Sequence, residues 1–560
     1  MRIRQKLKTI FRNENLRIFL FTLVLLVPYL RLFNGFFQQD EWYGFTDYVL
    51  LTGKDLPNLL ATLFSPSIGH YDPLSDLVIY VLYNTWGMNY QAFLLVSLTS
   101  HLIIINLVYR LAKRIFSNKQ KPAILATAFF TLFASSYQGT AWVVANIGTH
   151  GATIFGLLST ISFFDFLMSN KQSSRKFYLA IGLFFVSLLF KEITFGLFVV
   201  YFFACFLFGT KNKKNRGRYL TLLVTFCLVY IFARILMFFA PHEPASQFVT
   251  QTQSLGKLVY NFGMIPFKSI SQSTVPVGLI RLVADQVALV FPDTLTGGFG
   301  SPQFEVFVVK RVMEMISLGL AVLILLTGLV FFVKKRKSPI ILFSFLWIIV
   351  NSVIFAFSPE RSGVVFTVDS RNLYFISIGS AIVVAYFLTN FYTNKVWVTT
   401  AITVILFGAN IFWLNCELII FTQRGKIRRE ILQQIKNRYP DLPMKTLFYI
   451  QSDKSYYGLP EDQKILPFQS GLGQTLLVWY YPQEKFSKEF FKDRFLWEIE
   501  AQGYKEVGEV GFGFVREPLL LYEMKEKYNL PADAIIAFKW ISRTEELVDI
   551  TPEVRLELDK

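Results

Sequence analysis

Long apolar segments recur along this 560-residue chain and constrain its fold more than any other feature. Hydrophobic residues make up 53% of the sequence, which contains 60 phenylalanines. A helix needs about 20 apolar residues to cross a hydrocarbon core of about 30 Å, and segments of this length appear repeatedly. Because a soluble globule could not bury so much apolar surface, the sequence predicts a mainly α-helical, polytopic membrane protein.

The formal net charge of +17 would suggest a nucleic-acid partner in a soluble protein. Here, however, the lysines and arginines cluster in short links between apolar segments, where they act as topology signals. The links lie at residues 110–121, 171–176, 211–218 and 334–337. We therefore exclude nucleic acid as a partner and interpret the basic links as cytoplasmic.

The first apolar segment spans residues 18–37 and follows a basic N-terminal stretch. It has no small-residue cleavage site and is long enough to cross a membrane, so we interpret it as a retained helix rather than a signal peptide. The preceding basic residues place the N-terminus in the cytoplasm. Residues 38–72 then form the first outer loop.

The segment at residues 73–87 decides the topology of everything that follows. Its fifteen residues would span about 22 Å as a helix, which is too short for a hydrocarbon core. If it crossed the membrane, the next span would carry the basic link at 110–121 to the outside, against the positive-inside rule. We expect an interfacial helix here.

This choice places all the basic links on one side and gives about eleven spans. A large outer loop covers residues 241–308, and residues 275–290 within it predict a second surface helix. Residues 1–416 thus form the transmembrane domain. The expected spans are 18–37, 90–112, 122–138, 144–168, 177–190, 193–209, 219–240, 309–333, 339–357, 372–390 and 396–416.

Residues 417–560 have mixed charge and predict a small α/β domain. The number of preceding spans places this domain on the extracytoplasmic side of the membrane. Strands are expected at 446–451, 474–480 and 508–515, and a helix at 487–502. The basic residues at 424–438 oppose an outer location, because such charge usually stays in the cytoplasm. A basic helix lying on anionic lipid would reconcile the two signals.

Two adjacent acids, Asp40 and Glu41, follow the first apolar segment. Carboxylates beside hydrocarbon are costly to ionise, so this position suggests a functional site, with Trp42 and Tyr43 as interfacial anchors. The alternative is a solvated loop that ends the helix.

Further polar residues are expected on the same outer face. Such a mixture of acids and bases suits a lipid-phosphate substrate, because cations bind phosphate oxygens and a carboxylate can accept a proton from an attacking hydroxyl. The additional candidates are His70, Asp72, His150, Lys191, Glu192, Arg361, Asp369 and Arg371.

Each candidate also has a structural alternative. Lys191 and Glu192 could form a polar turn between short spans, and Arg371 could extend its side chain to the interface from a helix start. Histidines such as His70 and His150 are more often core or interfacial residues than ligands. No zinc, nucleophile-elbow or phosphate-loop motif is present, and the three cysteines lack metal-ligand spacing. We therefore predict no certain cofactor; the acids could bind a divalent cation, although no spacing requires one.

Four segments in order resemble the GT-C fold glycosyltransferases, in particular the tetratricopeptide-bearing O-mannosyltransferases and their bacterial relatives. Residues 70–116 have a Pro-Leu pair opening a short helix that closes in Trp-Gly, followed by a span with a central histidine. The other three are AWVVANIGTHGATIFGLLS at 141–159, LLFKEITFGLF at 188–198 and SRNLYFISIGSA at 370–381. The chain departs from that family at SSYQGTAW (135–142) and at 146–150, and it lacks the tetratricopeptide repeats.

The resemblance implies a transferase that uses a polyprenyl-phosphate-linked sugar on the outer face. It implies that Asp40 or Glu41 is the catalytic base and that Lys191 and Arg371 contact the donor phosphate. The same resemblance implies that His70 and Asp72 shape the pocket. Further predicted substrate-binding residues are Glu192, Arg361 and Tyr374.

The expected function is therefore inverting glycosyl transfer to a protein or glycan hydroxyl by a multi-pass enzyme of the plasma membrane. The alternative is a non-enzymatic transporter of lipid-linked glycans, or an envelope scaffold. A transporter should have paired repeats and charges near the middle of the membrane, and the sequence shows no convincing repeat.

Overall fold

The computed structural model divides into two compact units that interleave along the chain. Unit 1 comprises Met1–Leu30, Leu63–Val78 and Leu94–Leu418, and unit 2 comprises Arg31–Thr62, Ile79–Phe93 and Ile419–Lys560. The structure describes residues 14–65, 71–169, 174–208, 213–239, 254–290, 302–334, 338–357, 367–390, 396–456, 464–468, 471–482, 486–492 and 495–559.

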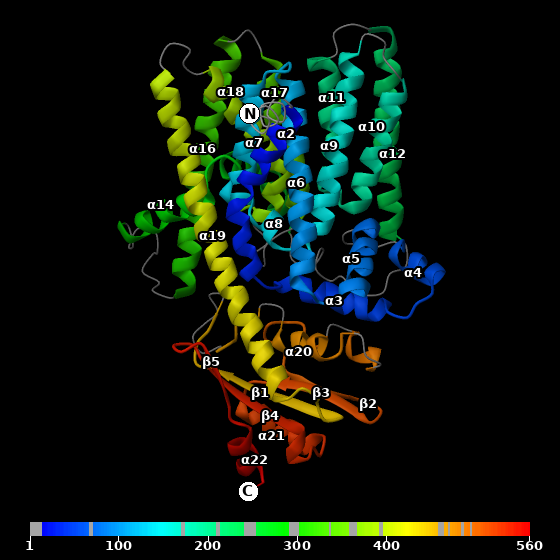
Figure 1. The fold of residues 1–560 in the computed structure, drawn as a ribbon, viewed down its shortest axis with the longest axis vertical. Helices are drawn as coiled ribbons and strands as arrows, with labels where there is room; N and C mark the ends of the chain where they lie inside the picture. Colours follow the sequence, from blue (N-terminus) through cyan, green and yellow to red (C-terminus); the bar gives the residue numbers. More distant parts are fainter. Residues whose placement is uncertain are drawn as a thin grey trace, which may run out of the picture. The chain divides into compact units, whose positions relative to one another are not determined.

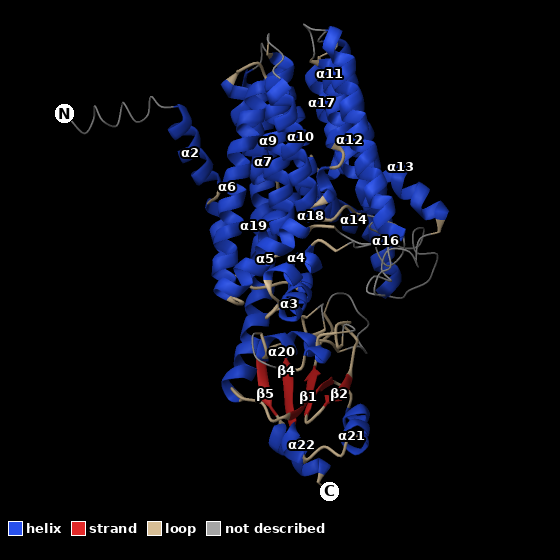
Figure 2. Ribbon diagram, turned by 90° about the vertical axis from the view of Figure 1, so that its right-hand side faces the viewer, coloured by secondary structure: helices blue, strands red, loops and turns tan. Residues whose placement is uncertain are grey.

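Unit 1 is a bundle of α-helices (Figures 1 and 2). Some of its helices extend into unit 2, namely α5 (Pro73–Trp86), α6 (Tyr90–Ile115) and α19 (Val396–Arg438). The remaining long helices are α2 (Glu14–Leu25), α7 (Gln120–Leu132), α9 (Asn146–Met168), α10 (Ser174–Phe190), α11 (Leu197–Leu207), α12 (Lys213–Phe239), α13 (Leu255–Gln272), α14 (Val277–Val290), α16 (Pro302–Lys334), α17 (Pro339–Val353) and α18 (Ser370–Asn390). Short helical turns connect them: η1 (Val27–Asn34), η2 (Ala134–Ser136), α8 (Gln138–Ala141), η3 (Glu192–Thr194) and η4 (Ile354–Phe357).

Seven helices among the described residues are long and apolar enough to cross a membrane, and the number rises to nine if each of two bent pairs forms one span. They correspond to seven of the eleven expected spans, and the first expected span is the bent pair α2 and η1, with a 45° break. The other three expected spans contain the shorter helices α7, α10 and α11, of 13, 17 and 11 residues. The chain is thus a polytopic membrane protein, as the apolar segments predicted.

In unit 1 the consecutive helices α6 and α7, α9 and α10, α11 and α12, and α16 and α17 run in opposite directions (Figure 1). The helix ends next to the basic links, between α6 and α7, α9 and α10, α11 and α12, and α16 and α17, consequently lie at one end of the unit. The C-terminus of α10 and the N-terminus of α18 lie at the other end. This arrangement separates the basic links from the segments that carry Lys191 and Arg371.

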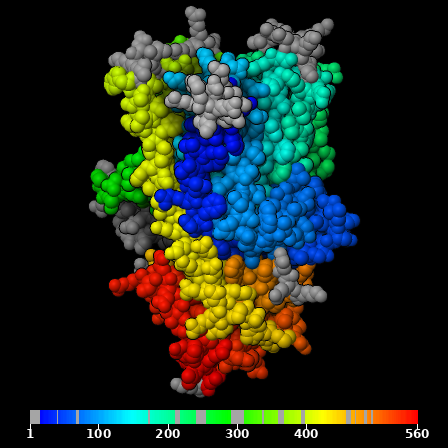
Figure 3. Space-filling model, viewed as in Figure 1, coloured from blue at the N-terminus to red at the C-terminus, as the bar shows by residue number. Residues whose placement is uncertain are grey.

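Helix α18 is central and α19 is peripheral in unit 1. In the apolar window of α18, 83% of the residues are buried, against 22% in α19. Figure 3 shows α19 exposed along the surface of the unit, where Trp397, Val404, Ile405 and Phe412 present large apolar side chains. Such a surface suits contact with lipid, because hydrocarbon does not penalise exposed apolar side chains.

Helices α13 and α14 form a second bent pair, with an angle of 104° between them. Helix α14 coincides with the expected surface helix at 275–290, whereas α13 was not predicted. The break falls between Gln272 and Val277 and contains Pro276, which has no backbone N–H to continue a helix. Both helices pack against α16.

The C-terminal part of unit 2 is a five-stranded mixed sheet with strand order β2-β3-β1-β4-β5. The three inner strands are parallel, and each edge strand is antiparallel to its neighbour. The strands are β1 (Lys445–Ser452), β2 (Gly503–Val507), β3 (Val510–Val515), β4 (Ile535–Ile541) and β5 (Glu546–Asp549).

Helices cover both faces of this sheet (Figure 2). Leu447 and Tyr449 of β1 point to one face and join a core with α21 (Pro518–Lys527) and α22 (Thr551–Leu558). The alternate residue Phe448 points to the other face, where its ring lies 6.1 Å from that of Tyr480 in α20 (Leu472–Tyr480). The alternation follows from the two-residue period of a strand, and it makes a three-layer α/β domain.

Two N-terminal helices, α3 (Gln39–Leu51) and α4 (Leu56–Leu63), also contribute to unit 2, α4 with all but its last residue. Helix α3 packs against α20, and Gln474 Nε2 donates a hydrogen bond to Thr46 Oγ1 at 3.0 Å. Trp42 is 1% exposed and its ring lies among those of Phe36, Phe37 and Trp479. Trp42 therefore packs against other side chains of unit 2 and does not expose its ring as the predicted anchor would.

The secondary structure of this domain was predicted in part. Strands β1 and β3 confirm two predicted strands, but the predicted strand at 474–480 is wrong, because these residues form α20. The predicted helix at 487–502 is also wrong: its described residues contain only the short turn η5 (Lys488–Phe490). Sequence analysis missed β2, β4 and β5.

Candidate functional site

A buried cluster of two histidines and a tyrosine joins α6, α9 and α18 in unit 1. His101 Nδ1 lies 2.6 Å from the hydroxyl oxygen of Tyr374, at hydrogen-bond distance. The His150 ring stacks on that of His101 with centroids 6.2 Å apart, and lies 5.2 Å from the ring of Tyr374. All three side chains are at most 2% exposed. His150 is thus a core residue, which is the structural alternative to an outer-face ligand.

Gly139 allows Tyr374 to take this position. A Cβ atom on Gly139 would lie 2.3 Å from Tyr374 Cδ2, far closer than two carbon atoms can approach. The tyrosine ring therefore packs directly on the backbone of α8. Any larger residue at position 139 would displace the ring that holds α8, α9 and α18 together.

Arg371 lies about one turn before Tyr374 on α18, at the end of unit 1 opposite the basic links. Its guanidinium carbon is 4.8 Å from the centroid of the Trp142 ring, a cation–π geometry. Arg371 Nε lies 4.0 Å from Asp369 Oδ2, and the Arg371 side chain is 30% exposed. The cation is thus oriented by an aromatic ring while part of it stays accessible to a ligand.

Lys191 lies between α10 and η3 and contacts the start of α9. Its Nζ donates a hydrogen bond to Thr149 Oγ1 at 3.3 Å, next to His150 in the chain. Glu192 follows as the first residue of η3. Helix α9 therefore connects the surroundings of Lys191 to the buried cluster around Tyr374.

A further cation, Arg234 of α12, lies over the ring of Tyr71 and was not predicted from the sequence. Its guanidinium carbon is 5.8 Å from the centroid of the Tyr71 ring. Burial raises the pKa of Tyr71, and the charge of Arg234 opposes this rise. Arg234 thus lies beside Tyr71, which directly precedes Asp72 in the chain.

The two predicted catalytic acids belong to unit 2, at the start of α3. The Glu41 side chain is buried, and its Oε2 accepts a hydrogen bond from the backbone N–H of Gln38 at 2.5 Å. This carboxylate caps the helix, because it satisfies a donor that the helix leaves unpaired. Asp40 lies in α3, and its side chain falls outside the part that the structure describes, as do His70 and Arg361 entirely.

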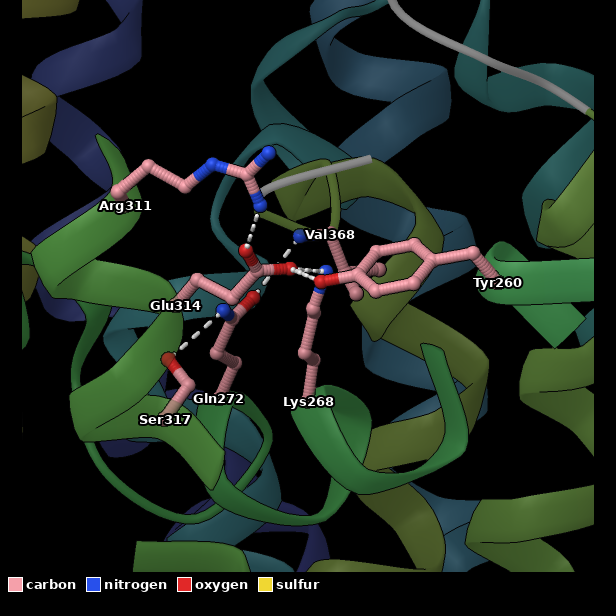
Figure 4. A network of polar contacts seen from close by, with 7 residues as sticks. All are labelled: Tyr260, Lys268, Gln272, Arg311, Glu314, Ser317 and Val368. Carbon is pink, nitrogen blue, oxygen red and sulfur yellow. Dashed lines mark hydrogen bonds and ion pairs between the residues drawn. The ribbon is translucent and has the colours of Figure 1, made fainter. Parts of the chain in front are cut away.

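A polar network inside unit 1 connects α13 to α16 (Figure 4). Glu314 is at its centre: its carboxylate forms an ion pair with Lys268 Nζ and accepts hydrogen bonds from Tyr260 Oη at 2.8 Å and Arg311 at 2.9 Å. The Lys268 side chain is 0% exposed and that of Glu314 is 4% exposed. A buried charge is tolerated when it is paired in this way.

The same helices hold the segment that leads into α18. Gln272 Nε2 donates to Ser317 Oγ at 3.0 Å, and Gln272 Oε1 accepts the backbone N–H of Val368 at 2.8 Å (Figure 4). Val368 directly precedes Asp369 and lies three residues before Arg371. The network therefore positions the backbone that presents both charged side chains.

A pocket of about 190 Å³ lies beside this segment, between α8, α14, α18 and α19. Its polar and aromatic walls come from residues far apart in the sequence. These are Ser135, Tyr137, Gln138, Thr367, Asp369, Ser370, Trp413 and Glu417.

Arg371, Lys191 and Glu192 were predicted from the sequence and stay predictions, whereas Lys268, Glu314 and the pocket were not predicted. Lys268 and Glu314 lay in segments that were assigned to the large outer loop and to the span at 309–333, and only the packing of α13 on α16 brings them together. A glutamate inside an apolar segment was the available signal, because such a residue needs a partner. No group of three or more His, Cys, Asp or Glu residues suitable for a metal ion occurs within the described residues, so the divalent cation stays a prediction without a site there.

Comparison with known proteins identifies no family for this chain. No family model matches it, and no curated protein matches it. Among solved structures, it is similar to ArnT from Cupriavidus metallidurans, determined as a crystal structure bound to undecaprenyl phosphate. The match covers 84% of this chain and 86% of ArnT, with a TM-score of 0.40 and 13% sequence identity.

Proposed function

We propose that this protein is a membrane glycosyltransferase that moves a sugar from a polyprenyl-phosphate donor to an acceptor hydroxyl. One observation carries the proposal: residues of four segments that resemble GT-C glycosyltransferases in sequence meet in unit 1. His101 contacts Tyr374, Arg371 lies over Trp142, and Lys191 bonds to Thr149. The convergence gives these segments one shared location, at the end opposite the basic links.

In this proposal Arg371 binds the donor phosphate. A guanidinium presents a planar fork to phosphate oxygens and stays charged at any physiological pH. Trp142 restricts its orientation, so less conformational entropy is lost when the phosphate binds. Lys191 supplies a second cation, and Asp72, Glu192, His70 and Arg361 are further candidates for the substrate site. Tyr374 acts as a positioning residue, because its hydroxyl is bonded inside the core.

The reaction inverts the anomeric carbon in one displacement. The acceptor oxygen forms a bond to that carbon while the bond to the phosphate oxygen breaks, and its electron pair leaves with the phosphate. The acceptor proton passes to a carboxylate. Asp40 is the proposed base rather than Glu41, because the Glu41 carboxylate already caps α3. Arg371 and Lys191 stabilise the charge that develops on the leaving phosphate.

The proposal is tested with purified full-length protein in lipid and a panel of labelled polyprenyl-phosphate sugars. Arg371→Ala should reduce turnover of the preferred donor by about 10² to 10³, the usual effect of removing one stabilising donor. The turnover rate of Arg371→Lys should lie between those of the wild type and Arg371→Ala, since lysine keeps the positive charge but not the planar fork of the guanidinium. Asp40→Asn should abolish turnover. Arg543→Ala, an exposed arginine in the C-terminal domain, is the matched control.

If a donor binds to the wild-type protein but is not turned over under any condition, the protein is instead a lipid-linked glycan transporter or an envelope scaffold. If a donor is turned over, the acceptor, a protein or a glycan, is sought by transfer of the label to membrane fractions.

We also propose a plasma-membrane location with a cytoplasmic N-terminus and an outer C-terminal domain. The shared end of the basic links supports this orientation, because lysine and arginine accumulate on the cytoplasmic side. The variant Asn118→Cys is made in a chain whose three native cysteines are replaced. Its thiol should react with a membrane-impermeant thiol reagent only after cell lysis. Labelling in intact cells would reverse the orientation.

A further inference from the structure

The pocket beside Asp369 has a composition that suits a sugar ring. We propose that it is the sugar subsite of the transferase and that it selects an uncharged sugar over the corresponding uronic acid. This inference rests on the proposed function, and it adds the chemical class of the donor sugar and the residues that choose it.

The volume of the pocket matches a single sugar ring. The pocket has a volume of about 190 Å³. A cavity of about 150 Å³ holds one benzene molecule, and drug-sized ligands need about 300 Å³ or more. A single six-membered ring with hydroxyl substituents fits between these limits.

The aromatic walls are the second argument. Trp413 of α19 and Tyr137 both line the pocket and are half-buried. Gly278 of α14 allows the indole to lie flat against that helix, since a Cβ atom there would be 2.5 Å from Trp413 Cε3. An aromatic face fixed in this way can pack against the C–H face of a sugar while its hydroxyls stay at the edge.

The polar walls are the third argument. Gln138 and Ser370 line the pocket and are tied together, because the backbone N–H of Gln138 donates to Ser370 Oγ at 3.2 Å. Their amide and hydroxyl groups can both donate and accept hydrogen bonds, as sugar hydroxyls require.

Charge sets the selectivity. Two carboxylates, Asp369 and Glu417, line the pocket, and the described lining residues include no lysine or arginine. Carboxylates accept hydrogen bonds from sugar hydroxyls but repel a ligand carboxylate. Arg371 is not among the lining residues, although its Nε lies 4.0 Å from Asp369 Oδ2. This polarity matches a donor whose sugar is neutral and whose phosphate is anionic.

The wall that carries Asp369 is held rigidly. Val368 also lines the pocket, and its backbone N–H is bonded to Gln272, which is 0% exposed. A fixed wall limits the loss of entropy on binding, so the orientation of a sugar can be specified by few contacts.

The test measures equilibrium binding to the full-length protein in lipid nanodiscs. The probes are polyprenyl-phosphate glucose, galactose and mannose, the three matched uronic acids, and polyprenyl phosphate alone. The best neutral sugar should bind at least about tenfold more tightly than its own uronic acid, because like charges in a confined site repel. The double variant Asp369→Asn, Glu417→Gln keeps the pocket's shape and should reduce this ratio by about tenfold.

A second variant tests the cavity without changing charge. Gly278→Val should push Trp413 into the pocket and weaken the neutral sugar lipid by about tenfold or more, with little effect on polyprenyl phosphate alone. Gly319→Val is the matched control, since a Cβ at Gly319 of α16 meets no atom within 4 Å.

The outcomes separate this inference from the proposed function. An unchanged neutral-to-uronic ratio in the double variant, or a sugar that adds nothing to the binding of polyprenyl phosphate, overturns the subsite while phosphate binding at Arg371 stands. If no polyprenyl phosphate of any kind binds to the wild type, both the subsite and the proposed function are overturned.

Discussion

Glu314 in unit 1 and Asp549 in unit 2 are almost equally buried, but their cations are placed differently. Their side chains are 4% and 5% exposed. Glu314 pairs with Lys268, which is fully buried, whereas Asp549 pairs with Arg438 at 2.6 Å, whose side chain is 64% exposed. In the helical bundle the ion pair must therefore be complete without water. In the α/β domain water shares the solvation of the cation.

Replacement of Glu314, the buried carboxylate of unit 1, should have the largest effect on stability. Glu314→Ala leaves Lys268 buried without its counter-ion, which costs about 3–5 kcal/mol for a broken buried pair. We expect a strong decrease in thermal stability and in the yield of monodisperse protein. The exposed Glu509→Ala is the control, and wild-type stability in Glu314→Ala would show that the pair does not form.

Removal of both charges should cost much less than removal of one. Lys268→Met with Glu314→Leu replaces the pair by apolar side chains, and such replacements are often neutral or stabilising. Arg311 remains charged, but its side chain is 45% exposed and can be hydrated. We expect stability within about 1.5 kcal/mol of wild type. A double variant as unstable as Glu314→Ala would locate the effect in packing rather than charge.

The carboxylate of the α/β domain should show a moderate, pH-dependent effect. Burial alone would raise the pKa of Asp549, but hydrogen bonds from Thr551 and Tyr439 and the charge of Arg438 together lower it. Asp549→Ala should cost about 1–3 kcal/mol through the lost charge-assisted hydrogen bonds. Hydrogen–deuterium exchange of β4 and β5 measures this locally.

The sign of the pH effect follows from the lowered pKa. The contribution of Asp549 is fully present above its unfolded pKa of about 3.9 and is lost as the pH falls through the lower folded value. Protection of β5 in the wild type should therefore decrease below about pH 4 towards that of Asp549→Asn. A difference between the two that stays constant down to pH 2 would contradict this assignment.

The exposed partner should matter least. Arg438→Ala removes a cation that is 64% exposed, so we expect a loss of about 0.2–1 kcal/mol. Salt should weaken the wild-type advantage, because exposed charges are screened. A loss as large as that of Asp549→Ala would erase the difference between the two ion pairs.

The parts of the fold that could be predicted from sequence are those determined by residues close together in the chain. The long spans follow from apolar length and from the basic links, which depend on local composition. Helix α20 could not be recognised as a helix, because residues 472–478 and Tyr480 are buried on all sides and show no amphipathic period. Its partners in α3 and the sheet are hundreds or tens of residues away in the chain.

Some residues of the candidate site could be proposed from the sequence, and others could not. Arg371 and Lys191 could be proposed because a cation at the end of an apolar segment is visible in the sequence. Lys268 could not, because its partner Glu314 is 46 positions further along and meets it only when α13 packs on α16. The pocket depends on four helices, and no local pattern encodes it.

The contact between Gly139 and Tyr374 restricts how such chains can diverge. Because the tyrosine ring occupies the space of a side chain at position 139, the two positions can change only together. A relative that keeps the tyrosine must keep the glycine, and one that gains a larger residue at 139 must also lose the hydrogen bond to His101. The pair is therefore a two-position signature with which distant relatives can be recognised and sorted, even where overall sequence identity gives no guidance.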